Sequence, residues 1–415
     1  MSSVTEICER AARTAPHVAQ LPARTKDAAL HAMADALETS ADRLVEANER
    51  DVDAARKEGT SETLLDRLTL TGSRLSSMAG GLRAVAAQND PVGEVVEGWK
   101  RPNGLLIEKV RVPLGVIAVI YEARPNVTAD VAGLCLKSGN ACVLRGSSIA
   151  LSSNTEIVTV LREAAVAQGV PEDAIQLIPD AERASAVALM QAKGLVDLLV
   201  PRGGQALIKS IEEQATVPYI IDGDGNCHVY VDRSADLEKA TAIVLNAKTQ
   251  RPSVCNAAET LLVHEELVDK WLPQCLDALG AKGVTVHGDE RVRQSWPSAT
   301  EATDEDWGKE YLDLELAVKV VSDLDEAIEH VNRWGTSNAE AIVTEDLTAA
   351  RRFASEVDSG SIFVNASTRF SDGGEFGYGA EIGISTQKLH SRGPMGLREL
   401  TTTKYVVWGD GQTRS

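Results

Sequence analysis

The sequence has no apolar run that approaches the about 18 residues needed for a membrane-spanning helix, which argues against a membrane protein. Its first residues, MSSVTEICERAARTA, carry acidic side chains and lack the apolar core of a signal peptide. We therefore predict a cytoplasmic protein. Basic residues are in the minority, because 42 Lys and Arg face 61 Asp and Glu, for a net charge of −19. An acidic surface repels nucleic-acid phosphates, so we expect no nucleic-acid partner, and an anionic substrate would need a local basic pocket.

Aromatic residues make up only 4% of the chain while hydrophobic residues reach 43%, so aliphatic side chains must pack the cores. The 415 residues suffice for two or three domains. The cysteines form no CxxC pair and no His/Cys spacing typical of zinc. They are Cys8, Cys135, Cys142, Cys227, Cys255 and Cys275. In a long cytoplasmic chain this scatter predicts neither a disulfide framework nor a metal site.

One cysteine, Cys255, lies on a short polar segment between two elements of regular structure. A helical pattern leads into the segment, and Arg251-Pro252 ends it, because proline disfavours the helical region for the preceding residue. Residues 260–263 then read as a buried strand. Backbone N–H groups on such a loop can stabilise a thiolate, so Cys255 is a candidate nucleophile. The alternative is a small buried hydrophobic residue.

The other cysteines fit structural roles better. Cys227 precedes His228, but neighbouring side chains on a strand point to opposite faces, so these two do not form a thiol–imidazole pair. Three more lie in apolar or amphipathic patterns typical of a core: Cys135, Cys142 and Cys275. Cys255 has no convincing His or Asp partner in the sequence, which argues against a cysteine hydrolase.

Strands alternate with helices from residue 113 onward, after a helical layer over residues 2–88. The predicted strands are 114–120, 141–144, 175–178, 195–200 and 218–221, and the predicted helices are 128–137, 152–168, 184–191 and 205–214. This alternation predicts an α/β fold with a doubly wound parallel sheet. Such sheets bind ligands at the carboxyl ends of their strands.

Polar residues gather at these strand ends, although the GxGxxG fingerprint of ordinary dinucleotide-binding folds is absent. They are Arg124, Asn126, Arg145-Gly146-Ser147-Ser148, Pro179-Asp180 and Pro201-Arg202-Gly203-Gly204. The 145–148 and 202–204 segments offer cationic or backbone donors to a phosphate at a helix start. Each can equally be a plain turn.

A second α/β unit follows a turn-rich hinge at residues 222–226. Its predicted strands are 228–231, 260–263, 284–286, 316–321, 341–343 and 361–364, and its predicted helices are 237–247, 265–279, 324–334 and 348–355. Residues 291–310 read as an exposed acidic loop. The glycine-rich segment 365–398 is long for a loop in a compact domain, which favours a functional role.

Residues 95–99 and 105–110 flank Asn103-Gly104, a strong signal for a β-hairpin. Residues 405–408 are a candidate strand that completes a sheet with this hairpin. A two-stranded ribbon is marginal alone in water, so we predict that it assembles with another subunit. The alternative is a solvated hairpin within one domain.

Four motifs in order carry a family resemblance over nearly the whole chain. They are VPLGVIAVIYEARPNVTAD from Val112, QRPSVCNAAETLLV from Gln250, VNASTRFSDGG from Val364 and STQKLHSRGPMGL from Ser385. The chain resembles the aldehyde dehydrogenase superfamily, and within it the γ-glutamyl phosphate reductase family. The resemblance implies two Rossmann-like α/β domains and a small β-hairpin oligomerisation element. Members of this superfamily bind a dinucleotide without GxGxxG.

The resemblance also implies roles for single residues. Cys255 matches the nucleophile, and Asn126 matches the oxyanion-hole asparagine, with Arg124 as a competing match. Arg145 stands where hydrolytic members carry a lysine near the adenosine ribose, and an arginine there can bind a 2′-phosphate, which fits NADPH. Asp222 replaces the glutamate base of hydrolytic members, in agreement with a reaction that does not use water. The expected cofactor-binding residues are Arg145, Gly146, Ser147, Ser148, Arg202, Gly203 and Gly204.

The implied reaction is the NADPH-dependent reduction of γ-glutamyl phosphate to glutamate 5-semialdehyde and phosphate through a cysteine thioester. The product would cyclise to 1-pyrroline-5-carboxylate, in the second step of proline biosynthesis. Glutamate 5-kinase is a candidate partner. An anionic substrate on an acidic chain needs cations, and the candidates are Arg124, Arg251, Arg369, Lys388, His390 and Arg392. For about half of them we expect ordinary ion pairs.

We expect the NADPH-binding domain to comprise residues 1–94 and 113–222, with 370–397 returning to it. The catalytic domain would span residues 223–369, and the oligomerisation element residues 95–112 and 398–415. Two alternatives remain open: a CoA-acylating aldehyde dehydrogenase, and a catalytically silent dinucleotide-binding protein. The second would typically have lost its nucleophile, and Cys255 is present.

Overall fold

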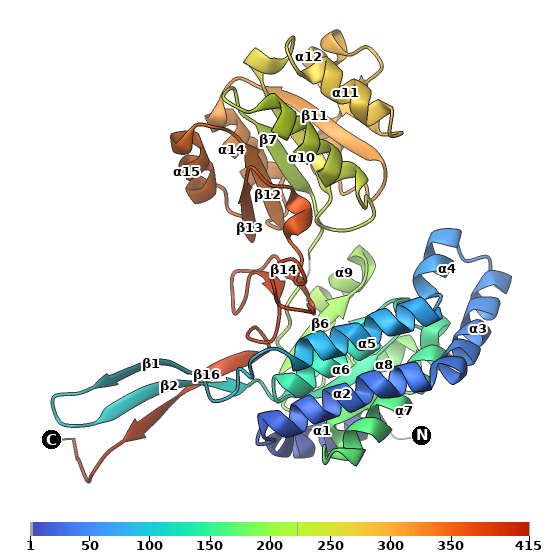
Figure 1. Cartoon of the computed structure of the whole chain (residues 1–415), viewed down its shortest axis with the longest axis vertical. Helices are drawn as coiled ribbons and strands as arrows, with labels where there is room; N and C mark the ends of the chain where they lie inside the picture. The colour runs from blue at the N-terminus through green and yellow to red at the C-terminus, as the bar shows by residue number, and fades with distance from the viewer. Residues whose placement is uncertain (1–2, 222, 415) are drawn as a thin grey trace. The chain divides into compact units, whose positions relative to one another are not determined.

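The chain divides into two compact units in a computed structural model that describes residues 3–221 and 223–414 (Figure 1). Unit 1 comprises Met1–Ile221, Gly377–Gly383 and Met395–Ser415, and unit 2 comprises Asp222–Phe376 and Ile384–Pro394. Of the segment 370–397, residues 377–383 and 395–397 belong to unit 1 and the others to unit 2. Which unit holds the cofactor stays a prediction.

The N-terminal layer of unit 1 is helical, as predicted. Its helices are α1 (Val4–Val18), α2 (Ala23–Thr39), α3 (Ala41–Lys57), α4 (Glu62–Leu68) and α5 (Gly72–Ala86). Helix α1 begins with a capping box, in which the Ser3 hydroxyl accepts from the Glu6 N–H and the Glu6 carboxylate accepts from the Ser3 N–H. The Thr71 hydroxyl caps α5 in a similar way by accepting from the Arg74 N–H.

Unit 1 contains a parallel four-stranded sheet in the order β5-β4-β3-β6. The strands are β3 (Val116–Tyr121), β4 (Ala141–Arg145), β5 (Ile175–Leu177) and β6 (Leu198–Arg202). The helices that alternate with them are α6 (Asn126–Lys137), α7 (Leu151–Ala167), α8 (Arg183–Met190) and α9 (Gln205–Gln214). The predicted fifth strand at 218–221 is wrong, because only a single bridge joins Tyr219 to Leu199. Pro218 has no N–H with which to continue the ladder.

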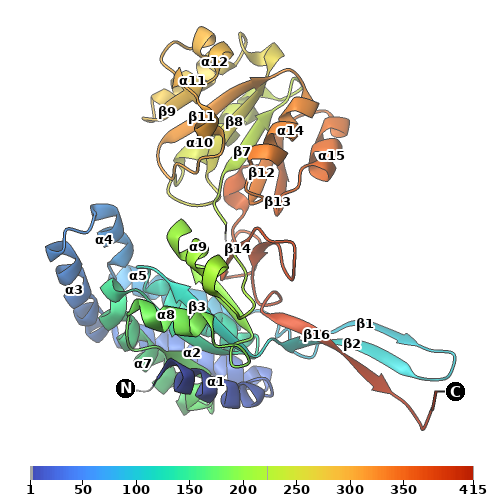
Figure 2. The same cartoon turned by 180° about the vertical axis from the view of Figure 1, so that it is seen from behind.

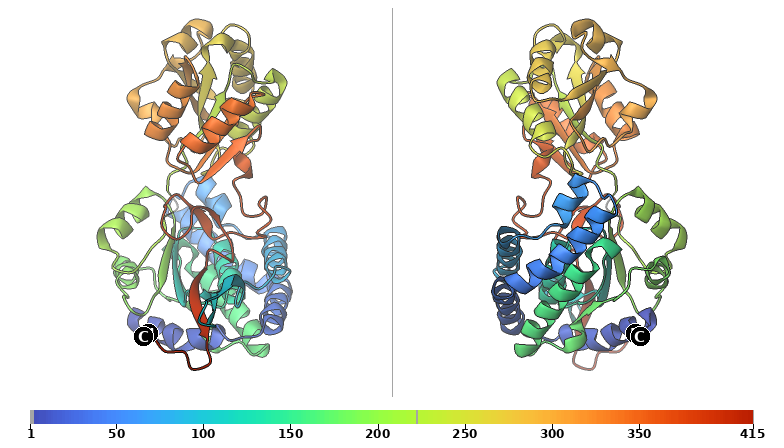
Figure 3. Two further views of the ribbon diagram at one scale, coloured as in Figure 1. Left: turned by 90° about the vertical axis from the view of Figure 1, so that its left-hand side faces the viewer. Right: turned by 90° about the vertical axis from the view of Figure 1, so that its right-hand side faces the viewer.

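Both faces of this sheet are covered by helices, as Figure 3 shows. Strand β3 is buried along its whole length. Ile117 and Val119 pack in the core formed with α2, α5, α6 and α7, whereas Ala118 and Ile120 pack in the core formed with α1, α8 and α9. This alternation explains the unbroken apolar run, because every side chain of the strand meets a hydrophobic layer.

Unit 2 contains a seven-stranded parallel sheet in the order β10-β9-β11-β8-β7-β12-β13 (Figure 2). Its strands are β7 (Cys227–Val231), β8 (Ala258–His264), β9 (Thr285–Gly288), β10 (Thr300–Glu301), β11 (Glu315–Val321), β12 (Ala339–Val343) and β13 (Ser361–Val364). Its helices are α10 (Leu237–Thr249), α11 (Leu272–Gly280), α12 (Glu290–Ser295), α13 (Asp304–Trp307), α14 (Leu324–Trp334) and α15 (Leu347–Glu356). All six predicted strands of this unit are confirmed.

Two predictions for unit 2 are wrong. The predicted helix 265–279 is split into a short 3₁₀ turn at Glu265–Leu267 and α11, because proline is favoured in the first turn of a helix and Pro273 is the second residue of α11. The predicted loop 291–310 contains α12, β10 and α13. The Asp289 side chain caps α12 by accepting from the Val292 N–H, and Asp306 in the first turn of α13 accepts from the Thr303 N–H. Acidic residues that suggested a solvated loop, such as Asp306, therefore begin a helix instead.

The predicted hairpin is confirmed, and β16 (Thr401–Trp408) joins it in a three-stranded antiparallel sheet. Strand β1 (Val95–Lys100) pairs with β2 (Leu106–Pro113), and β2 pairs with β16 in turn. Gly104 has a φ of +91° at the turn, which explains why a glycine is needed there. A separate two-stranded sheet joins β14 (Gly383–Ser385) and β15 (Gly393–Met395).

Candidate active site

Cys255 lies on the connection between α10 and β8, where the sequence placed it. The Ala257 N–H donates to the Val254 carbonyl at 3.0 Å, so Cys255 sits inside a tight turn just before the strand. Its side chain is half-buried, whereas the other five cysteines are buried. Burial raises the pKa of three of these, Cys8, Cys227 and Cys275, which keeps them protonated and unreactive.

The backbone of Cys255 is held from one side by the chain around Gly225. A Cβ on Gly225 would lie 1.8 Å from the Cys255 carbonyl oxygen, so only glycine fits. The Gly225 N–H donates to Glu310 Oε1 at 2.8 Å, and Cys227 Sγ donates to the Cys255 carbonyl at 3.2 Å. The signal in the sequence was the pair of glycines within residues 222–226, which had indicated only a hinge.

The loop is held from the other side through Asn256, which is buried. Its Nδ2 donates to the Ser371 carbonyl at 2.9 Å, and its own carbonyl accepts from Thr368 Oγ1 at 2.7 Å. These bonds attach the Cys255 loop to the 3₁₀ turn Thr368–Phe370, which belongs to the glycine-rich segment. The glycine-rich segment therefore supports the loop of the predicted nucleophile, and a functional role for it stays a prediction.

This turn brings Arg369 to the Cys255 loop. Arg369 Nε donates to Gln250 Oε1 at 2.9 Å. Burial lowers the pKa of the Arg369 guanidinium, the charge of Asp372 offsets this in part, and Arg251 and Cys255 also lie within electrostatic range. Arg369, a predicted substrate cation, thus lies within electrostatic range of Cys255, and Arg251 lies within range of Arg369.

A buried ion pair joins the two ends of the same connection. Lys248 Nζ lies 2.5 Å from Glu259 Oε2, and both side chains are fully buried. Burial raises the pKa of Glu259 to about 7, and Lys248 opposes that change. The pair links the last turn of α10 to the start of β8, so it holds the two ends of the Cys255 loop together. Sequence analysis missed it, because neither residue stands in a recognisable pattern.

Two other predicted substrate cations form ion pairs with Asp358. Lys388 Nζ and Arg392 Nη1 each lie 2.6 Å from its carboxylate oxygens, and the two cations hold the pKa of Asp358 below its usual range. His390 is exposed, with a φ of +72°. Lys388 and Arg392 thus have the ordinary ion-pair role that we expected for about half of the cations.

In unit 1, Arg124 and Asn126 follow the end of β3. Arg124 is half-buried, and its carbonyl accepts from the Val127 N–H at 3.0 Å as α6 begins. Asn126 is the first residue of α6 and is exposed, and its Nδ2 donates to Asp130 Oδ2 at 3.0 Å. Cys255 and Asn126 belong to different units, so their common site stays a prediction. Asp222 lies outside the described residues.

The segment after β4 has features that suit a polar ligand. Arg145 Nη2 donates to the carbonyls of Ala181 and Glu182, but its Nε and the Ser147 hydroxyl are buried without a hydrogen-bond partner. A Cβ on Gly146 would lie 2.1 Å from Asn154 Nδ2, so this position has no room for a side chain. Ser148 is exposed and begins a short 3₁₀ turn before α7. These residues fit the oxygen-rich part of a dinucleotide.

The segment after β6 differs from the expectation. The Gly204 N–H, which the sequence offered to a phosphate, donates to Glu122 Oε1 at 3.0 Å. A Cβ on Gly203 would lie 2.8 Å from the same carboxyl group, so Gly203 makes room for Glu122. A phosphate at the start of α9 would meet this carboxylate, and sequence reasoning had not singled out Glu122. Arg202, at the end of β6, lies within electrostatic range of Asp130.

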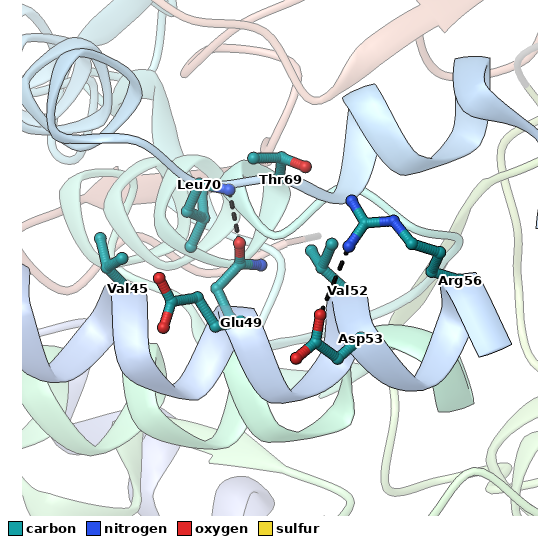
Figure 4. Close-up of a pocket in the computed structure, with 8 residues that line it drawn as sticks. Val45, Glu49, Val52, Asp53, Arg56, Thr69 and Leu70 are labelled. Atoms are coloured by element: carbon teal, nitrogen blue, oxygen red, sulfur yellow. Dashed lines mark hydrogen bonds and ion pairs between the residues drawn. The ribbon is translucent and has the colours of Figure 1, made fainter.

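A groove on unit 1 lies apart from these residues (Figure 4). It runs between α3 and the segment Thr69–Leu70, and its lining contains none of the predicted site residues. Asn48, in its wall, accepts from the Leu70 N–H at 2.6 Å and donates to the Leu68 carbonyl at 2.9 Å. Within residues 3–221 and 223–414, no group of three or more His, Cys, Asp or Glu side chains is arranged to hold a metal ion.

A sequence profile of the aldehyde dehydrogenase family matches residues 1–302 and 316–406. A γ-glutamyl phosphate reductase from Thermobifida fusca is 56% identical over 411 residues, which cover 99% of this chain and 98% of that protein. The chain belongs to the γ-glutamyl phosphate reductases of the aldehyde dehydrogenase family. One from Moorella thermoacetica is 56% identical over 406 residues, covering 98% of this chain and 97% of that protein.

A crystal structure shows the same fold. γ-Glutamyl phosphate reductase from Thermotoga maritima has a TM-score of 0.98 and 45% identity, and the match covers 100% of both chains. The predicted aldehyde dehydrogenase-like α/β fold is therefore confirmed, and the family implies a nicotinamide dinucleotide cofactor. None of the helices in the described part of the chain has the length and apolar character to cross a membrane.

Proposed function

We propose that this chain reduces γ-glutamyl phosphate to glutamate 5-semialdehyde with release of phosphate, through a thioester on Cys255. The names of relatives at 56% identity support the substrate. The observation that carries the covalent route is the exposure of the six thiols, because Cys255 is half-buried while the other five are buried. Cys255 also lies within electrostatic range of Arg369, as does the buried Cys227. The product is an amino aldehyde that cyclises to 1-pyrroline-5-carboxylate, so we assign the reaction to proline biosynthesis.

In this mechanism the Cys255 thiolate attacks the acyl carbon and phosphate leaves, which produces the thioester. Arg251 and Arg369 would stabilise the anionic substrate as it binds. When bound, the dinucleotide supplies the hydride that reduces the thioester. The Cys255 thiolate then departs from the thiohemiacetal and the aldehyde is released.

Both tetrahedral steps place negative charge on the former carbonyl oxygen. The Cys255 backbone N–H and the Asn126 side-chain amide are the proposed donors to it. The loss of one such donor typically costs about 2.7–4 kcal/mol. We propose NADPH as the cofactor, with the oxygen-rich groups held by Arg145, Ser147 and Ser148 and by the backbone of Gly146. The cation Arg202 completes the proposed binding strip, whereas the Gly204 N–H is used by Glu122.

The reverse reaction tests the proposal. Pyrroline-5-carboxylate, phosphate and NADP⁺ are supplied, and NADPH absorbance is followed. We expect turnover to require phosphate, because phosphate is the group that releases the acyl chain from Cys255. In its absence, NADPH should form only as a burst of about one equivalent per active site. Turnover that ignores phosphate but requires coenzyme A would indicate a CoA-acylating enzyme instead.

Arg145→Ala tests the cofactor choice. Its free Nε offers a charged donor to a 2′-phosphate, and hydrogen bonds to charged groups contribute about 1.5–3 kcal/mol. We therefore expect the KM for NADPH to rise by about 10–100-fold. The KM for NADH, which has no 2′-phosphate, should change much less. Equal losses with both cofactors would mean that Arg145 only supports the carbonyls of Ala181 and Glu182.

We further propose that the sheet β1-β2-β16 assembles with a second copy of this chain. Strand β1 is exposed along its whole length, and the sheet presents large apolar side chains to solvent. They are Val95, Val96, Trp99, Leu106, Tyr405, Val407 and Trp408. Strands β1 and β16 also form the two edges of the sheet, where backbone groups can pair with another strand.

Val407→Asp is expected to shift the protein to a smaller species in analytical ultracentrifugation, because it places a charge on this apolar surface. Val166→Asp is the matched control, since Val166 is 43% exposed on α7 and Val407 is 52% exposed on β16. The control should sediment like the wild type. An unchanged sedimentation coefficient for Val407→Asp would remove the sheet from the interface.

We assign the protein to the cytoplasm, where its proposed cofactor is available. An acyl phosphate forms when a kinase phosphorylates a carboxylate, here the γ-carboxylate of the substrate's precursor. Because an acyl phosphate is prone to hydrolysis, a nearby supplier would protect it. Glutamate 5-kinase is the proposed partner on this ground.

A further inference from the structure

One carboxylate in unit 1 has no place in the proposed chemistry so far. Asp130 lies one helical turn after Asn126 on α6, and its Oδ2 accepts from Asn126 Nδ2 at 3.0 Å. We propose that Asp130 is a positioning residue that fixes the orientation of the Asn126 amide, so that its second N–H is directed to the substrate oxygen. This inference rests on the oxyanion role proposed for Asn126.

The argument begins with the ambiguity of an amide. The side chain of asparagine has a donating NH₂ end and an accepting oxygen, and rotation by half a turn exchanges them. Only the NH₂ end can stabilise an oxyanion, since the oxygen would repel it. An ionised carboxylate only accepts hydrogen bonds, so Asp130 binds the NH₂ end. One N–H is then used by Asp130 and the other stays available.

The surroundings keep Asp130 in its accepting form near neutral pH. Burial raises its pKa to about 6, and the Asn126 bond and the charge of Arg202 limit the rise. Arg202 faces Asp130 from β6, and α5 presents the uncharged Gly81. A Cβ on Gly81 would lie 3.7 Å from Asp130 Oδ1, so α5 lies close to the carboxylate without crowding it. Below pH 6 a protonated Asp130 can donate to the amide oxygen and stabilise the wrong rotamer.

The experiment is a double-mutant cycle in the reverse assay, with Asn126→Ala, Asp130→Ala, the double variant and the near-isosteric Asp130→Asn. Loss of the Asn126 donor should lower kcat by about 100–1000-fold. We expect Asp130→Ala to lower kcat by about 10–100-fold, with KM values for phosphate and pyrroline-5-carboxylate within about threefold of wild type. The double variant should be no slower than Asn126→Ala, because Asp130 acts only through Asn126.

The pH profile provides a readout that a merely structural role would not change. Wild-type kcat should fall below pH about 6, and this limb should be absent in Asp130→Asn. If the rate losses of Asn126→Ala and Asp130→Ala multiplied in the double variant, the inference would be overturned. It would also be overturned if Asp130→Ala lowered thermal stability at unchanged kcat. Either result would leave the role of Asn126 intact. Wild-type kcat in Asn126→Ala would overturn the oxyanion role and this inference together, while the thioester route would stand.

Discussion

Replacement of Cys255 by alanine is expected to lower kcat of the reverse reaction by at least about 10⁴-fold. Without the thiol no thioester forms, and the burst of NADPH in the absence of phosphate should vanish as well. The burst is the sharper measurement, because it counts the covalent step directly. Circular dichroism and thermal unfolding should stay close to wild type, since the side chain is half-buried and its backbone makes the loop contacts.

The matched control is Cys275→Ala on α11, whose thiol is buried in the core of unit 2. It removes one thiol of the same protein and should lose some stability at nearly unchanged kcat. If Cys255→Ala kept more than about 1% of the wild-type rate, another group would have to be the nucleophile.

The second large effect is expected for Gly225→Ala. The added Cβ would lie 1.8 Å from the Cys255 carbonyl oxygen, 2.4 Å from its carbon and 2.5 Å from its Cα. All three are backbone atoms, so no side-chain rotation relieves the overlap. Either the chain at Gly225 or the Cys255 loop must move. We expect the free energy of unfolding to fall by about 3–5 kcal/mol and kcat to fall with it.

Gly80→Ala is the control for this substitution. Gly80 is exposed within α5, and no atom lies within 4 Å of a Cβ at that position. The same change should therefore stabilise the protein by about 0.5–1 kcal/mol, because alanine is the better helix former. Thermal unfolding of both variants measures the contrast. Wild-type stability and kcat in Gly225→Ala would show that the Cys255 loop is not held by this contact.

Much of the fold could be predicted because the periodicity of apolar residues reports burial directly. Strand β3 reads as an unbroken apolar run since both of its faces are covered, and α14 was predicted with its observed bounds. The failures have local causes. Pro218 cannot extend a ladder, Pro273 lies in the first turn of α11, and acidic residues within 291–310 form the first turn of α13. Charge alone does not distinguish a capped helix from a solvated loop.

The sequence by itself determined the family, the parallel sheets and the candidate nucleophile, because motifs and periodicity are properties of neighbouring residues. Only the tertiary structure decided what surrounds them. It placed Arg369 beside the Cys255 loop, Gly225 against its backbone, and Asp130 on the amide of Asn126. It also paired Lys388 and Arg392 with the Asp358 carboxylate. Such contacts join residues far apart in the chain or depend on side-chain direction, and no local pattern encodes either.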